Sequence, residues 1–195
     1  MRKVALIDYS SSSVSLLIAK TEGSVMESIL HTRTPLSFAG SVYQDRKLTE
    51  IEIPELLDIT DSFIITCKEN GVSNLYAIAS ANLASVKGID DILALVTEKT
   101  GLGIYKLDMA TEAEARIFAN ERYSILPHST LIDFGSITTK IYSFSDYISS
   151  VPLGPLPLGQ DYVGEVIPTR TEAKRMKVAI KEALDEANVA EEGLF

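Results

Sequence analysis

Leu131 to Thr139 reads L-I-D-F-G-S-I-T-T, and the chain carries a similar stretch near its start, where Leu6 to Ser15 reads L-I-D-Y-S-S-S-S-V-S. Each copy has Leu-Ile-Asp, then an aromatic residue, then a run of small hydroxylated or glycine residues. A β-type run follows each copy, so each predicts a strand, a tight turn and a second strand. The two aspartates of the repeat, Asp8 and Asp133, are 133 − 8 = 125 positions apart.

The repeated stretch has the chemistry of a phosphate site. An Asp at the end of a buried strand, next to backbone N–H groups that a Ser/Gly turn leaves free, suits a phosphate group and its metal ion. One such turn is weak evidence, because Asp and Ser are ordinary turn residues. Two copies with matching flanks predict two similar half-structures that face each other across one cleft.

The composition is that of a soluble globular protein with one or two domains. The chain has 195 residues, 46% of them hydrophobic and 23% charged, and no apolar run reaches the roughly 18 residues that span a membrane. A net charge of −9 argues against nucleic acid as a partner. The lone Cys67 excludes an internal disulfide and fits a reducing cytoplasm. Its place on the apolar face of a predicted helix favours a buried packing role over a nucleophile.

The hydrophobic pattern predicts an α/β protein with a mixed sheet. We expect Pro54 at a first helical position, a helix stop at Asn70-Gly71, and Asp90 or Asp91 as the cap of a helix that Gly101 ends. The expected strands are 4–8, 14–20, 27–34, 75–79, 104–109, the second hairpin and 148–151, and the expected helices are 54–69, 90–99, 111–122 and 170–188. The stretches 35–47, 80–88 and 120–129 are expected to be loops or links, and 152–159 is too broken by proline to pair throughout in a sheet.

The last predicted helix also carries a basic face. Arg170, Lys174, Lys177 and Lys181 follow one another at helical spacing. This face is either an ordinary solvated surface among acidic neighbours or a ledge that binds a polyanion.

Five motifs in the same order resemble those of the exopolyphosphatase and guanosine pentaphosphate phosphohydrolase (Ppx/GppA) family. The family's two phosphate loops, D-x-G-S-N-S and D-x-G-G-G-S-T-E, align with Asp8–Ser13 and Asp133–Lys140. Its T-x-A-L-R stretch aligns with Ser80–Ala84, its G-x-E-E-A-R helix start with Thr111–Arg116, and its L-P-L-G segment with Leu156–Gly159. The likeness runs from Val4 to about Asn188, nearly the whole chain.

The resemblance implies an α/β, ribonuclease H-like fold, which actin, sugar kinases and chaperone ATPases share. It implies a first domain over 1–122 and a partial second domain over 123–195. Family members continue beyond the position of residue 188 with more strands and helices. Either the chain is part of a longer one, or a second chain, as in a homodimer, covers the sheet edge and the apolar stripe of the last helix.

The resemblance also implies a reaction and its residues. It implies hydrolysis of polyphosphate or a guanosine polyphosphate, with Glu114 activating water and with Asp8 and Asp133 orienting Mg²⁺. The phosphate-binding residues that it implies are Ser11, Ser13, Gly135, Ser136 and Thr138. On spacing alone, Thr111 and Glu114 also fit a helix capping box, so Glu114 could simply close a helix start.

Several positions depart from the family motifs. Lys140 replaces the acidic residue that ends the second loop, and Ile137 replaces a glycine within it. Ala84 replaces an arginine expected to clamp phosphate, and Ala113 replaces the first Glu of the helix-start pair. These changes support a second hypothesis, in which the chain is a catalytically impaired relative that senses a ligand or self-associates.

Overall fold

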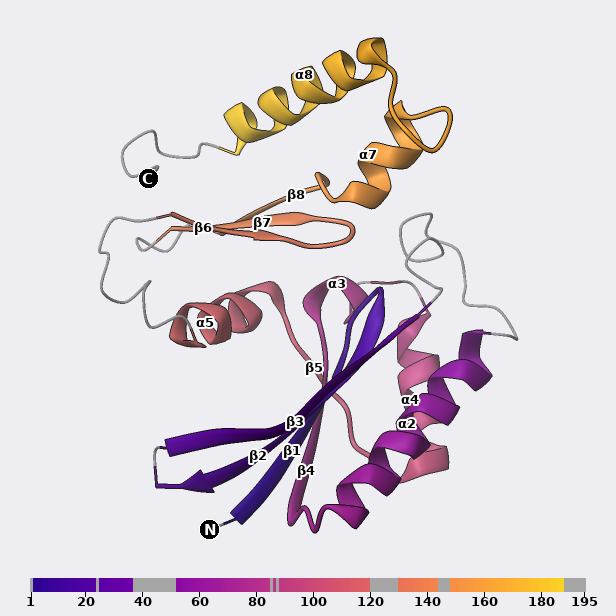
Figure 1. Ribbon diagram of the computed structural model, residues 1–195, viewed down its shortest axis with the longest axis vertical. Coiled ribbons are helices and arrows are strands. Elements are labelled where there is room, and N and C mark those ends of the chain that lie inside the picture. The colour runs from indigo at the N-terminus through magenta and orange to yellow at the C-terminus, as the bar shows by residue number, and fades with distance from the viewer. Residues whose placement is uncertain are drawn as a thin grey trace. The chain divides into compact units, whose positions relative to one another are not determined.

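The structure is a computed structural model that describes residues 2–23, 25–36, 52–84, 86, 88–119, 130–143 and 148–187 (Figure 1). By their contacts, the residues form two compact units, Met1–Met109 and Ala110–Phe195. The predicted domain division after residue 122 falls beyond helix α5 (Met109–Ala119), which by its contacts belongs to the second unit.

The first unit is built on a five-stranded mixed sheet of order β3-β2-β1-β4-β5. The β1/β2 and β2/β3 pairs are antiparallel, whereas the β1/β4 and β4/β5 pairs are parallel. The strands are β1 (Arg2–Tyr9), β2 (Ser13–Glu22), β3 (Val25–Pro35), β4 (Asn74–Ala79) and β5 (Tyr105–Lys106). The predicted strand at 104–109 is therefore reduced to two residues.

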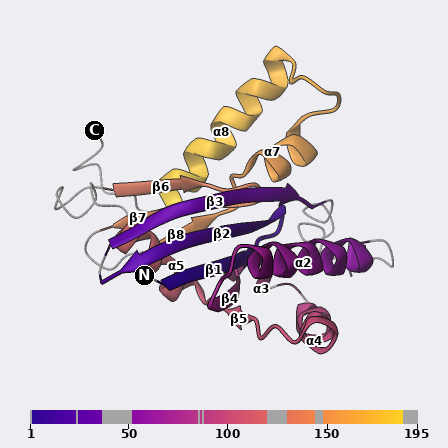
Figure 2. The same cartoon turned by 60° about the horizontal axis from the view of Figure 1, so that its bottom comes forward.

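Helices α2 (Glu52–Glu69) and α4 (Ile89–Thr100) lie side by side on one face of this sheet (Figure 2). Alternate residues of β1 and β2 point to this face, as the period of two in a strand requires. The buried cluster includes Ala5, Ile7, Val14, Leu16, Ile18, Leu56, Phe63, Cys67, Leu93 and Val96. Cys67 is thus a packing residue, as predicted, and burial raises the pKa of its thiol.

The second unit has a three-stranded antiparallel sheet of order β6-β7-β8. Ile141 and Val151 on one face of this sheet pack against Ala187 at the end of the last helix, while α5 provides the charged partners of the other face. The elements are β6 (Thr130–Phe134), β7 (Thr139–Ser143), β8 (Ile148–Val151), α7 (Pro155–Tyr162) and α8 (Arg170–Glu186).

The predicted internal repeat is present in the hairpin register. In the first unit Tyr9 pairs with Val14 across a four-residue turn, and in the second Phe134 pairs with Thr139 in the same way. All four positions keep the offset of 125 that separates Asp8 from Asp133 (134 − 9 = 125 and 139 − 14 = 125). The strands β6, β7 and β8 therefore correspond to β1, β2 and β3.

Some local predictions are wrong. Neither Asp90 nor Asp91 caps α4, because the helix starts at Ile89 after Gly88 in a left-handed conformation (φ 79°), which places both aspartates in the first turn. The helix stop at Gly71 (φ 66°) is confirmed. Helix α2 begins at Glu52, so Pro54 lies within its first turn rather than at its first position.

Two short helices were not predicted from the sequence. Helix α3 (Ala81–Ala84) follows β4 directly. Helix α7 starts at Pro155 after Gly154, because a proline is tolerated where its missing N–H would have no helical partner. Of the loop expected over 35–47, residues 37–47 lie outside the described residues, as does the link expected over 120–129. Pro35 is the last residue of β3, and the last helix ends at Glu186, before the predicted 188.

The basic residues of α8, Arg170, Lys174, Lys177 and Lys181, are all exposed. The helix begins with a capping box in which the Thr169 hydroxyl accepts from the Glu172 N–H and the Glu172 carboxylate accepts from the Thr169 N–H. Hydrogen bonds to the Glu172 carboxylate, first of all from the Thr169 N–H and then from the Thr169 hydroxyl and the Gly164 N–H, lower the pKa of Glu172.

We expect Thr60→Val to destabilise the first unit by about 1–3 kcal/mol, because it leaves a buried hydroxyl unsatisfied. The Tyr9 hydroxyl lies in the core, where its partner is the Thr60 hydroxyl at 2.9 Å and burial raises its pKa to about 12. Native-state hydrogen exchange of the β1 amides measures the loss. Thr66→Val, which removes an exposed bond from the same helix to the Ser62 carbonyl, is the matched control and should cost much less. Equal losses in the two variants would contradict this account.

Candidate functional site

The first predicted phosphate loop is a closed four-residue turn. The Ser10 N–H donates to the Ser13 carbonyl at 2.9 Å, and the Ser10 hydroxyl lies 3.0 Å from the Ser13 hydroxyl. Ser11 and Ser13 are both buried within the turn. Asp8, at the end of β1, is half-buried and pairs in register with Ser15. The loop thus gathers serine hydroxyls next to one carboxylate.

Arg33 on β3 supplies a positive charge to this loop. Its Nε donates to the Ser13 hydroxyl at 2.7 Å, and its Nη2 donates to the Ser12 hydroxyl at 3.4 Å. Arg33 is otherwise exposed, so part of its guanidinium stays available to an anion. Sequence reasoning missed this residue. The pairing of β2 with β3 could have identified it, because that pairing places Arg33 opposite Ser15 and beside the loop.

The second loop closes with the same bond. The Gly135 N–H donates to the Thr138 carbonyl at 2.9 Å. A Cβ at Gly135 would lie 2.8 Å from that carbonyl oxygen, so the turn requires glycine here for space. Ile137, which stands where the family motif has a glycine, is buried in this loop.

The segment that follows β8 holds the second loop through two backbone hydrogen bonds. The Gly154 N–H donates to the Ile137 carbonyl at 2.9 Å, and the Leu156 N–H donates to the Ser136 carbonyl at 3.1 Å. A Cβ at Gly154 would lie 2.4 Å from the Ser136 carbonyl oxygen. Only glycine allows the two backbones to approach this closely.

A network of four charges lies beside the second loop. The Lys140 Nζ lies 2.5 Å from the Glu112 Oε1, and both side chains are almost fully buried. The Arg116 Nη2 lies 3.3 Å from the same carboxylate, and its Nε lies 3.1 Å from the Asp133 Oδ2. The network therefore alternates ammonium, carboxylate, guanidinium and carboxylate, with a net charge of zero.

The charges of the network act on neighbouring groups. Burial alone would lower the pKa of Arg116, but the charges of Asp133 and Glu112 raise it above its usual value. Burial raises the pKa of Tyr142 to about 12, although the charge of Arg116 opposes this shift. Both residues therefore keep one charge state at physiological pH.

Glu114 lies apart from this network on α5, where its side chain is exposed. The capping-box alternative for Glu114 is wrong, because α5 begins at Met109 and Thr111 is already inside the helix. Sequence reasoning missed Glu112, the buried glutamate of the same helix. The signal was its spacing of four residues from Arg116, which allows an ion pair on one helix face.

The predicted metal ligands meet different surroundings. The described residues contain no group of three or more His, Cys, Asp or Glu side chains that could hold a metal ion. Asp133 pairs with Arg116 and stands opposite Lys140 in the β6/β7 register. Asp133 therefore has two cationic side chains beside it, Arg116 and Lys140. Because Mg²⁺ needs several oxygen ligands, these surroundings do not fit it. The metal role of Asp8 in the first unit stays a prediction.

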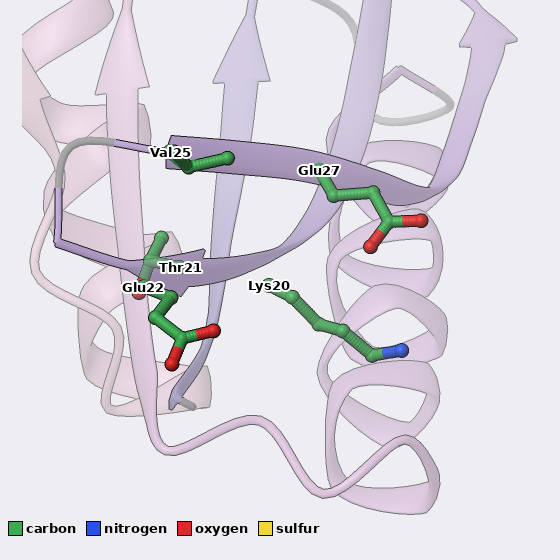
Figure 3. Close-up of a pocket in the computed structure, with 5 residues that line it drawn as sticks. All are labelled: Lys20, Thr21, Glu22, Val25 and Glu27. Carbon is green, nitrogen blue, oxygen red and sulfur yellow. The ribbon is translucent and has the colours of Figure 1, made fainter.

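The cavity shown in Figure 3 lies away from the first loop. It measures about 290 Å³ and is lined by Lys20, Thr21, Glu22, Val25 and Glu27, at the far end of the β2–β3 hairpin (Figure 3). Between Ser13 and Lys20 the strand β2 extends roughly 23 Å, at about 3.3 Å per residue. The cavity is therefore no part of the first predicted phosphate loop.

Comparison with solved structures identifies the fold. The chain is similar to a Ppx/GppA family member from Aquifex aeolicus, with 24% identity, a TM-score of 0.73 and coverage of 95% of this chain and 62% of that one. It is similar to an exopolyphosphatase from Cytophaga hutchinsonii, with 16% identity, a TM-score of 0.80 and coverage of 94% and 61%. It is also similar to the ethanolamine utilization protein EutJ from Carboxydothermus hydrogenoformans, with 14% identity, a TM-score of 0.52 and coverage of 95% and 72%.

The predicted fold class is thereby confirmed: the chain has the ribonuclease H-like α/β fold of Ppx/GppA proteins, and the resemblance drawn from the motifs holds at the level of the fold. The chain spans 61–62% of the length of these two relatives. No protein-family profile and no curated protein matches the sequence. Among the described helices, none combines the length and apolar character of a membrane span.

We expect Gly154→Ala to destabilise the second unit by about 1–3 kcal/mol, the usual cost of overpacking. The backbone of Gly154 (φ −72°, ψ 161°) suits any residue, so a loss would come from the close approach to Ser136 alone. Hydrogen exchange of the Gly135–Thr138 amides reports it. The control is Gly159→Ala in the middle of α7, where an added Cβ meets nothing within 4 Å and should be neutral or stabilising. A Gly154→Ala variant as stable as Gly159→Ala would refute the contact.

We expect Lys140→Met to cost about 3 kcal/mol, because it removes the buried one of the two cations that pair with the buried carboxylate of Glu112. The double variant Glu112→Leu, Lys140→Met removes both charges and should regain most of the loss. Urea unfolding of the second unit measures both. For comparison, Lys106→Met breaks an exposed pair with Asp90 and should cost about 1 kcal/mol or less. No difference between the single and the double variant would show that the pair does not govern stability.

Proposed function

We propose that this chain is a divergent relative of the Ppx/GppA proteins and binds a polyphosphate or guanosine polyphosphate through its two hairpin loops. The observation that carries the proposal is the repeated loop geometry. In each unit a strand with an Asp next to its last residue leads into a four-residue turn. A hydrogen bond of 2.9 Å from the first N–H of the turn to its fourth carbonyl closes it. The neighbours of this fold include an exopolyphosphatase.

The first loop has the groups that a terminal phosphate needs. The hydroxyls of Ser11 and Ser13 can donate to phosphate oxygens, and Arg33 adds a guanidinium, whose bonds to phosphate are charge-assisted. This positive charge offsets the loss of the arginine that Ala84 replaces. In the second loop, Gly135, Ser136 and Thr138 are the proposed phosphate contacts.

Hydrolysis of the phosphoanhydride bond is the proposed reaction, with Glu114 orienting the attacking water. The exposure of its carboxylate supports this role, because water can reach it. The proposed compartment is the reducing cytoplasm, which suits the buried thiol of Cys67.

One observation favours a second candidate function, ligand binding without turnover. Arg116 already engages the carboxylate of Asp133, and Lys140 stands where the resemblance implies an acidic residue. With Asp133 engaged in this way, the chain would lack a carboxylate that the hydrolytic mechanism uses and would act as a sensor.

We expect Arg33→Met to weaken binding of tripolyphosphate about tenfold or more, the loss typical of one charge-assisted hydrogen bond. Isothermal titration calorimetry measures the affinity. The matched control is Arg2→Met, which removes the same charge from β1 at the other end of the sheet, where Arg2 pairs with Thr21. Equal weakening in both variants would mean that Arg33 acts only through net charge.

We expect phosphate release from polyphosphate to fall at least about a hundredfold in Glu114→Gln, within the range for loss of a general base. Glu182→Gln, an exposed glutamate on α8, is the control and should leave the rate unchanged. Wild-type protein that binds tripolyphosphate but releases no phosphate would support the sensor. Absence of both binding and release would remove the proposal altogether.

A further inference from the structure

The carboxylates beside the second loop are neutralised by cationic side chains of the same unit. Asp133 lies on β6, directly opposite Lys140 on β7, and both side chains face α5. From α5, Arg116 reaches Asp133 and Glu112 reaches Lys140. Each carboxylate of the network thus has a cationic side chain within ion-pair distance.

The burial of Lys140 makes this arrangement specific. A buried ammonium is stable as a cation only when a counter-charge and hydrogen bonds replace its water. Lys140 is 4% exposed and Glu112 is 5% exposed. The Lys140 ammonium donates a charge-assisted hydrogen bond to Glu112 Oε1. The position therefore pairs a buried cationic side chain with a buried carboxylate.

A divalent cation at Asp133 would meet two obstacles. It would have to displace the Arg116 guanidinium, and it would lie next to the buried ammonium of Lys140 across the β6/β7 pair. Repulsion between like charges is strongest where water is excluded. The carboxylate of Glu112, the other oxygen donor of the network, is already shared by Lys140 and Arg116.

We infer that the ammonium of Lys140 is the resident cation of the second hairpin, and that together with Arg116 it takes the charge-balancing place of a divalent metal ion there. The second loop therefore keeps its conformation without metal, and Asp133 binds no divalent ion. This inference concerns metal binding alone and stands independently of whether the protein hydrolyses polyphosphate.

One substitution should convert the site. Lys140→Glu places a third carboxylate beside Asp133 and Glu112, with only Arg116 left to balance them. Three converging carboxylates are a typical binding site for Mg²⁺ or Mn²⁺. The variant should therefore gain a metal site that the wild-type hairpin lacks.

The test uses Mn²⁺, whose unpaired electrons broaden the NMR signals of nearby amides. In wild-type protein, Mn²⁺ should leave the amide signals of Gly135–Thr138 unchanged. In Lys140→Glu, the same signals should lose most of their intensity, and EDTA should restore them. Lys177→Glu on the exposed face of α8 makes the same charge change and is the control. It should behave as the wild type does.

Two results would overturn the inference: broadening of Gly135–Thr138 in the wild type that Asp133→Asn abolishes, or an equal response of Lys140→Glu and Lys177→Glu to Mn²⁺. Broadening in the wild type confined to Ser10–Ser13 supports it, because that metal would belong to the first loop. Should Lys140→Glu not fold, the wild-type and Asp133→Asn spectra still decide the matter.

Discussion

A single backbone hydrogen bond, from the first N–H of a four-residue turn to its fourth carbonyl, shapes both loops of this protein. It closes Ser10–Ser13 in the first unit and Gly135–Thr138 in the second. Because the bond fixes where each strand re-enters its sheet, it also fixes the register of β1 with β2 and of β6 with β7. The side chains that line each loop follow from that register, since neighbouring residues of a strand point to opposite faces.

The cationic side chains beside the two loops have different surroundings. In the first, Arg33 reaches over from a neighbouring strand and donates to serine hydroxyls, so a partly exposed cation lies at the turn. In the second, the cations Lys140 and Arg116 are engaged by carboxylates of the same unit. The repeat is thus one of backbone geometry, while its two copies have distinct electrostatics. An anion would meet open positive charge at the first loop and a balanced network at the second.

The sequence alone predicted the two hairpins, but it did not predict the residues of other elements that contact them. The repeated Leu-Ile-Asp and the small residues after it predicted both turns, because this information is local. Arg33 and Glu112 were missed, because their roles depend on which strand and which helix pack beside the loops. Asp90 or Asp91 was predicted as a cap from the residue preference alone, whereas Gly88 in a left-handed conformation precedes the true start of α4. Helix α7 was missed because prolines that exclude a strand also suit the first turn of a helix.

The close approach at Gly154 joins the second loop to the start of α7. Two amides from one segment hold two successive carbonyls of the other, with no room for a side chain between them. The loop and the first turn of α7 are thereby a single mechanical block, in which neither can be lengthened or shifted by a residue without breaking both bonds. Sequence drift at this place is confined to side chains that point away from the contact, and grafting either segment into another protein would require transferring the other with it.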